Sequence, residues 1–107
     1  MPDLVYHTID GLQVTLESWN WERHIQLRHP EVTEQDIAYA LTAPQRICDH
    51  REISTQRVYQ GSPRTRGFFR GSFPMVIVEV TNTQTGRVVT AYLTTLAYPG
   101  QQRWPSM

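Results

Sequence analysis

The chain has 107 residues, of which 39% are hydrophobic and 19% are charged, and this composition is typical of one folded domain. Ten basic and ten acidic residues give a formal net charge of zero, which argues against a protein that holds nucleic acid by bulk charge alone. No apolar run is long enough to span a membrane, and the N-terminus lacks the basic and apolar regions of a secretory signal. A single cysteine, Cys48, cannot form an internal disulfide, so we expect a cytoplasmic protein.

The neutral total conceals an uneven distribution of charge. All ten basic residues are arginine, and after Asp49 the only acidic residues are Glu52 and Glu79. An arginine-rich face is therefore one interpretation of the second half of the chain, and ordinary surface solvation is the other.

The first segment predicts a β-hairpin. Apolar and polar residues alternate over residues 12–17, as they do in a strand with one buried face. Asp10-Gly11 is a tight-turn signal between the segments Leu4–Ile9 and Leu12–Leu16.

A first helix is predicted to end near Arg28. Trp21, Ile25 and Arg28 are four and three residues apart, which places them on one side of a helix. The residue before a proline avoids the α conformation, so Pro30 stops this helix.

A second helix is predicted to begin after Thr33. Thr33 and Asp36 have the spacing of a capping box, and Val32 with Ile37 has that of a hydrophobic staple. Pro44 ends this helix.

The remainder of the chain is strand-like. Met75–Val80 is almost entirely apolar and predicts a central strand, Asn82–Gly86 a turn, and Arg87–Leu96 an antiparallel return. Tyr98–Met107, with its prolines and glycine, is expected to be irregular. Shorter strand candidates are residues 46–50, 56–60 and 68–69. The order indicates a single α+β domain over residues 1–107, with helices packed on one face of the sheet.

His24 and Arg28 are four residues apart and therefore share one face of the first helix. Together they suit metal-independent RNA cleavage, in which a base takes the ribose 2′-OH proton, an acid protonates the leaving 5′ oxygen, and cations bind the phosphate. Histidine titrates near neutral pH, and arginine binds phosphate in a bidentate manner. The alternative is an inert surface histidine beside Glu22 or Glu31.

Alternation along the last strand predicts Val89 and Ala91 in the core, and Thr90 and Tyr92 on the opposite, polar face. The two hydroxyls of that polar face are candidate catalytic groups beside His24.

Three further residues are predicted to bind substrate. Arg57 and Tyr59 share a face of an earlier strand, and Arg70 ends a segment of mixed arginine and phenylalanine that could follow a phosphodiester backbone. A solvated hairpin anchored by phenylalanine is the alternative for that segment.

No metal or cofactor motif is present, and we predict none. One cysteine and four scattered histidines do not supply a zinc site, and no glycine-rich phosphate loop occurs. Cys48 and His50 would share a strand face and could form a thiol nucleophile, but a buried strand cysteine is the simpler interpretation.

Three stretches together resemble a known group. The pattern W-x-x-H-I-x-x-R-H-P-E over Trp21–Glu31, A-L-x-x-P-x-x-I over Ala40–Ile47 and V-V-T-A-Y-x-T over Val88–Thr94 is similar to small phage-type nucleases of the barnase/EndoU/colicin/RelE-like superfamily. With the strands between them, the resemblance spans roughly residues 10–96.

The resemblance implies an α+β fold with two N-terminal helices on a curved antiparallel sheet of about four strands, and metal-independent endoribonuclease activity. His24 matches the helical histidine and Arg28 the basic residue one turn later, while Thr90 and Tyr92 match hydroxyl residues of the terminal strand. Arg57 and Arg70 have no motif match. The net charge of zero differs from that of RelE-like toxins, which are usually strongly basic.

The expected function is therefore a cytoplasmic ribonuclease that is toxin-like or phage-derived, with RNA as substrate and an acidic antitoxin or immunity protein as partner. The alternatives are a non-catalytic protein-binding module on the same fold and a structural subunit of a homodimer. No membrane association is expected, and the sequence leaves the oligomeric state open.

Overall fold

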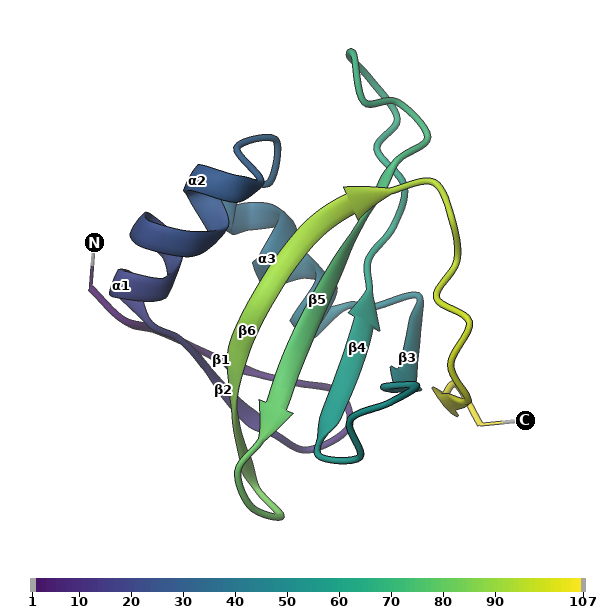
Figure 1. Ribbon diagram of the computed structural model, residues 1–107. Coiled ribbons are helices and arrows are strands. Elements are labelled where there is room, and N and C mark those ends of the chain that lie inside the picture. The colour runs from purple at the N-terminus through teal and green to yellow at the C-terminus, as the bar shows by residue number, and fades with distance from the viewer. Residues whose placement is uncertain (1, 107) are drawn as a thin grey trace.

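The computed structural model describes residues 2–106 and combines short helices with a mixed, seven-stranded sheet (Figure 1). The strands are β1 (Leu4–His7), β2 (Gln13–Leu16), β3 (Arg46–Asp49), β4 (Gln56–Gln60), β5 (Phe73–Val80), β6 (Thr85–Thr94) and β7 (Gln102–Trp104). Their order is β1-β2-β6-β5-β4-β3-β7, and every neighbouring pair is antiparallel except β2 with β6. No helix within the described part of the chain is long and apolar enough to cross a membrane.

The predicted arrangement, two N-terminal helices on an antiparallel sheet of about four strands, is wrong. The β1–β2 hairpin precedes both helices and joins the sheet through a parallel pair, in which Gln13–Thr15 aligns with Thr85–Arg87. The tail that was expected to be irregular supplies β7, whereas residues 68–69 form no strand. These pairings join segments far apart in the chain, and local periodicity does not reveal them.

The first helical segment is continuous but contains one wider turn. It consists of α1 (Ser18–Asn20), the π-helical turn η1 (Trp21–Ile25) and α2 (Gln26–Arg28). The Gln26 N–H donates to the carbonyl of Trp21, five residues earlier, which defines the π turn. The helix ends at Arg28, as Pro30 predicts.

The second helix, α3 (Glu34–Thr42), confirms its sequence signals. The Thr33 hydroxyl accepts from the Asp36 N–H, and the Asp36 carboxylate accepts from the Thr33 N–H, so both halves of the capping box form. Ile37, Ala40 and Leu41 are buried on its inner face, where α3 packs against β5 and β1.

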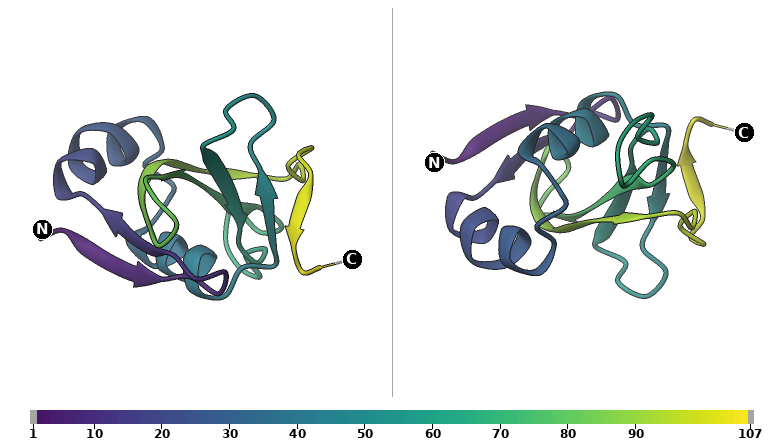
Figure 2. Two further views of the ribbon diagram at one scale, coloured as in Figure 1. Left: turned by 90° about the horizontal axis from the view of Figure 1, so that it is seen from below. Right: turned by 90° about the horizontal axis from the view of Figure 1, so that it is seen from above.

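The sheet has an inner and an outer face. Figure 2 shows α3 and the β1–β2 hairpin on one side of the central strands, and the loop after β3 on the other. The larger hydrophobic core lies on the inner face and consists of residues from β2, α3 and the central strands: Leu12, Val14, Leu16, Ile25, Val32, Ile37, Ala40, Leu41, Ile47, Tyr59, Val76, Val78, Val88 and Ala91. A smaller cluster on the outer face consists of Val58, Phe73 and Met75, against which Tyr92 and Tyr98 pack.

A β-bulge in β6 changes which residues face the core. Ile77 aligns with Thr90 but Val78 aligns with Val88, so Val89 has no partner in β5. Val88 is buried and Val89 is exposed, which makes the predicted core position of Val89 wrong. One extra residue inverts the alternation along a strand, and a sequence pattern does not mark such an insertion.

The side chain of Asn20 fixes the bulge to the helix. Its Nδ2 donates to the carbonyl of Val88 at 2.7 Å and to that of Val89 at 3.1 Å, and the residue is buried. Beyond the short pairing of β6 with β2, the carbonyls on this edge of β6 thus accept hydrogen bonds from Asn20 of α1.

Replacing Asn20 by alanine should lower the free energy of unfolding by about 2–3 kcal/mol, because buried carbonyls would lose both donors. The control Asn20→Asp has the same shape without the donor and should destabilise at least as much. Urea denaturation measures both variants. A loss below about 0.5 kcal/mol for Asn20→Ala would show that the bulge does not depend on this amide.

Candidate functional site

The sheet separates the predicted site residues. Residues that align across antiparallel strands project from the same face. Tyr92 aligns with Met75 and Thr90 with Ile77 on the outer face. Arg57 and Tyr59 align with Val78 and Val76, which belong to the inner core. The outer pair and the inner pair therefore do not share one cleft.

Arg57 and Tyr59 meet, but they do so around an internal carboxylate. The Arg57 guanidinium lies 2.8 Å from Asp10 Oδ2, and the fully buried Tyr59 hydroxyl donates to Asp10 Oδ1 at 2.8 Å. The Thr8 hydroxyl also donates to Asp10. This cluster ties the β1–β2 turn to β4, so Arg57 and Tyr59 have a structural role, and their contact with substrate stays a prediction.

His24 lies at a different place from Tyr92. The imidazole of His24 is exposed and stands edge-on to Trp19, with 5.7 Å between ring centroids and an interplanar angle of 84°. It lines a pocket together with Arg87 and Val89. Arg28 and Arg70 are exposed, the first on α2 and the second in the loop before β5.

His29, rather than His24, is the imidazole beside Tyr92. The two ring centroids are 6.0 Å apart. His29 is the C-cap of α2 and has non-helical dihedral angles (φ −133°, ψ 65°). Helical spacing therefore does not apply to it, and the turn at Pro30 directs it to β6. The His-Pro pair in the sequence was the available signal.

A pocket of about 370 Å³ opens on the outer face next to this contact. Its floor is formed by Met75 and Tyr92, and its walls by the segments that follow β3 and β6. The complete lining is His50, Arg51, Glu52, Met75, Tyr92, Thr94, Leu96, Ala97, Tyr98 and Pro99. His50 and Tyr98 are in ring contact, with 6.0 Å between centroids. Two histidines and two tyrosines thus gather on one face of the sheet, in the order His29, Tyr92, Tyr98, His50.

A carboxylate lies close to His29. Its Nδ1 lies 3.5 Å from Glu31 Oε1, and both side chains are partly shielded from solvent. An imidazole whose Nδ1–H faces a carboxylate presents Nε2 as a proton acceptor. In the tautomer with its proton on Nδ1, His29 has a free Nε2 and can act as a general base.

His50 is held in the opposite tautomer. Its Nδ1 accepts from the backbone N–H groups of Glu52 and Ile53, each at 3.1 Å. A ring nitrogen that accepts carries no proton, so the neutral imidazole has its proton on Nε2 and acts as a donor. His50 is suited to binding an anionic oxygen and not to taking a proton.

The two tyrosines supply hydroxyl groups to the same pocket. Burial raises the pKa of Tyr92, and Tyr98 raises it further, so the Tyr92 hydroxyl stays protonated at neutral pH. The Tyr98 oxygen accepts from the Arg51 N–H at 2.9 Å, which fixes its ring against the loop after β3.

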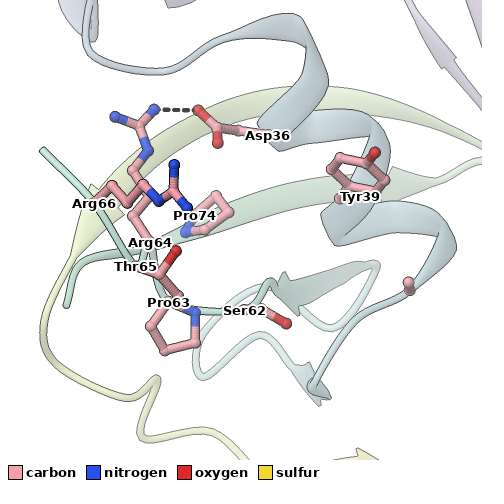
Figure 3. Close-up of a pocket in the computed structure, with 9 residues that line it drawn as sticks. Asp36, Tyr39, Ser62, Pro63, Arg64, Thr65, Arg66 and Pro74 are labelled. Carbon is pink, nitrogen blue, oxygen red and sulfur yellow. Dashed lines mark hydrogen bonds and ion pairs between the residues drawn. The ribbon is translucent and has the colours of Figure 1, made fainter. Parts of the chain in front are cut away.

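A larger pocket, of about 450 Å³, lies between α3 and the loop before β5 (Figure 3). The carboxylate in its wall, that of Asp36, is bound by the Arg64 guanidinium and by the capping box. No histidine or cysteine lines it. This pocket therefore lacks a free proton acceptor and is a weaker candidate for a reaction centre than the smaller one.

The structure does not favour the thiol nucleophile that Cys48 could have supplied. Cys48 is buried, and burial raises the pKa of its thiol, which opposes formation of the thiolate nucleophile. Among residues 2–106, no three histidine, cysteine, aspartate or glutamate side chains lie close enough together to hold a metal ion.

Comparison of the chain with known protein families, with curated proteins and with solved structures finds no match. The resemblance to phage-type nucleases accordingly stays a prediction, and the candidate site is defined by its geometry alone.

The buried Tyr59 makes stability depend on pH in the alkaline range. Burial, and then the Asp10 charge, raise its pKa above the ordinary value of 10.0. Above pH 10 the unfolded chain releases this proton whereas the folded chain keeps it, so the free energy of unfolding should fall by about 1.4 kcal/mol per pH unit. Denaturant unfolding between pH 9 and pH 11 measures this dependence.

In Tyr59→Phe the free energy of unfolding should fall less steeply above pH 10, by about 1.4 kcal/mol per pH unit. At neutral pH the same variant should be about 1 kcal/mol less stable, because it lacks the hydrogen bond to Asp10. Equal slopes in both proteins would contradict a folded state that keeps Tyr59 protonated.

Proposed function

We propose that the chain is a metal-independent endoribonuclease whose reaction centre is at the Tyr92 side of the outer pocket, where His29 contacts the Tyr92 ring. The observation that carries the proposal is the contact of His29, which has the Glu31 carboxylate nearby, with the Tyr92 ring, beside a pocket lined by further donors. A base, a neutral acid and anion-binding donors are the groups that cleavage through the 2′-OH requires.

The proposed reaction uses two protein groups for proton transfer. His29 Nε2 takes the proton of the ribose 2′-OH, and the oxygen attacks the adjacent phosphorus. The bond from phosphorus to the 5′ oxygen breaks, and the Tyr92 hydroxyl gives that oxygen its proton. The products are a 2′,3′-cyclic phosphate and a 5′-OH, and transfer of the proton from His29 to Tyr92 through solvent restores the enzyme.

Donors around the pocket would stabilise the charge on the phosphate. The Nε2–H of His50 and the guanidinium of Arg51 belong to the pocket wall. Arg28 directly precedes His29 and is exposed, so it keeps its predicted role as a phosphate ligand. Thr90 lies on the same outer face, two residues before Tyr92, and can orient the ribose.

The proposal includes the expected setting of such an enzyme. RNA would be the substrate and the cytoplasm the location, and a protein that restrains a toxin of this kind would be acidic. The support for an acidic partner is the scarcity of acidic residues after Asp49, where the chain carries most of its arginine.

A protein-binding module is the second candidate, and one observation favours it. Phe68 is 96% exposed at the tip of the loop before β5, where it contacts Phe69, and the Arg64 guanidinium lies over the Phe69 ring. Exposed aromatic and arginine side chains are typical of binding hot spots.

Incubation with a mixed pool of RNA in EDTA tests the enzyme. His29→Ala should lower kcat/KM by about 10²–10⁴-fold, because general-base catalysis has that magnitude. Tyr92→Phe should lower it as well. The matched control is His7→Ala, a substitution at an exposed histidine on the distant strand β1. Circular dichroism verifies that each variant is folded.

Cleavage that persists in His29→Ala would remove His29 from the mechanism. A substrate with a single 2′-deoxyribose at the scissile position should remain intact, since it lacks the nucleophile. If the wild-type protein cleaves no RNA in the pool, the protein-binding module becomes the better proposal.

A further inference from the structure

A third and smaller pocket lies along β6, between that strand and the first helical segment. Its volume is about 220 Å³, and it is lined by Glu17, Trp19, Asn20, His24, Arg87, Val88 and Val89. None of these residues belongs to the lining of the reaction pocket. The pocket contains His24, which the sequence pattern singled out and the proposed mechanism does not use.

Trp19 is the distinctive residue of this pocket. Its side chain is 48% exposed, although tryptophan is usually well covered in a folded domain. The indole Nε1–H donates to Glu17 Oε2 at 3.0 Å, and the His24 ring stands edge-on against the indole. The ring is therefore held in one orientation and still reaches solvent, as a stacking platform requires.

The charges at the rim suit a phosphodiester chain. The Arg87 guanidinium is more than half exposed and lies 3.9 Å from the Glu17 carboxylate, a long pairing that leaves donors available to solvent. His24 adds an exposed imidazole in contact with the indole. An aromatic ring flanked by such groups is the usual composition of a site for a nucleobase and its phosphate.

The position of the pocket relates it to the reaction centre. Val89 in this pocket and Tyr92 in the other are three residues apart on β6, which corresponds to roughly 10 Å of strand. That distance is about three nucleotides of a stacked single strand, and fewer when the strand is extended. Trp19 lies in α1 and His29 directly follows α2, so one continuous helical segment sets the separation of the two residues.

We propose that the Trp19 pocket is a base-binding subsite that stacks one nucleobase of single-stranded RNA, a few nucleotides from the cleaved bond. This inference rests on the proposed ribonuclease function and specifies its substrate as unpaired RNA. In a duplex both faces of each base are covered by neighbouring base pairs, so a paired base cannot stack on the indole.

Binding without cleavage tests the subsite. The protein carries His29→Ala, and the probe is a fluorescently labelled ten-nucleotide single strand of mixed sequence that contains 2′-deoxyribose throughout. Adding Trp19→Ala should raise the dissociation constant by roughly 5- to 150-fold, the range expected for loss of one stacked base. Trp19→Phe should retain most of the affinity, because a ring remains.

Tyr39→Ala is the matched control. Tyr39 is an exposed aromatic residue on α3, outside both pockets of β6, and its replacement should leave the dissociation constant unchanged. Equal affinity of the Trp19→Ala variant and its parent for the single strand would overturn the subsite. So would equal affinity of the parent for the single strand and for the same sequence as a duplex.

A kinetic comparison separates this inference from the reaction itself. In the protein with His29 intact, Trp19→Ala should lower kcat/KM for a ten-nucleotide RNA but not for a dinucleotide, which reaches the reaction centre alone. A similar loss on both substrates would overturn the subsite. Absence of cleavage would contradict the ribonuclease proposal, while the binding measurement would still decide the role of Trp19.

Discussion

Two hydrogen bonds from one amide hold the first helical segment against β6. Asn20 donates to the carbonyls of Val88 and Val89, at the bulge where the strand is no longer paired with β2. Together with the packing of Ile25 and Trp21 against the core, this attachment sets the position of the helical segment. It places Trp19 beside the strand at one end of the segment and His29 against Tyr92 at the other. Because the amide is buried, its bonds do not compete with water, and their loss would leave both acceptors unsatisfied.

The two faces of the sheet carry different groups of polar side chains. On the inner face, Asp10 is surrounded by Arg57, Tyr59 and Thr8, and the whole cluster serves to close the hairpin over the core. On the outer face, Tyr92 keeps its proton because it is half-buried, but it borders a pocket that solvent enters. Similar residue types thus stabilise the fold on one side and remain available for proton transfer on the other.

Local signals in the sequence predicted local structure well. The capping box at Thr33, the helix end before Pro30, the turn at Asp10-Gly11 and the central strand over residues 75–80 were all correctly predicted, because each depends on neighbouring residues. The strand number was wrong, since the pairings of β2 with β6 and of β7 with β3 are long-range.

The site was only partly predictable for the same reason. The sequence pattern pointed to Tyr92 on its strand and, through helical spacing, to His24, whereas the imidazole that contacts the Tyr92 ring is that of His29. The Pro30 turn gives His29 a non-helical backbone, so no periodicity could include it. Alternation of apolar and polar residues likewise did not predict the bulge at Val89. His50 and Tyr98 lie in loops, where no periodic pattern predicts the position of a side chain.

The segment between β6 and β7 is anchored to β3 and to the loop after it, through the hydrogen bonds of Asp49 to Gln101 and of Arg51 to Tyr98 and through the side chain of Arg46. The Arg46 guanidinium donates to the carbonyls of Tyr98 and Gly100 and to the side chain of Gln102. The outer pocket therefore has a base of strands paired along their length and one border formed by a loop with fewer hydrogen bonds, and such a loop opens at a lower free energy than a sheet. In the proposed ribonuclease, nucleotides of different size would enter and depart by bending that border, without displacing Tyr92 from the paired strand β6.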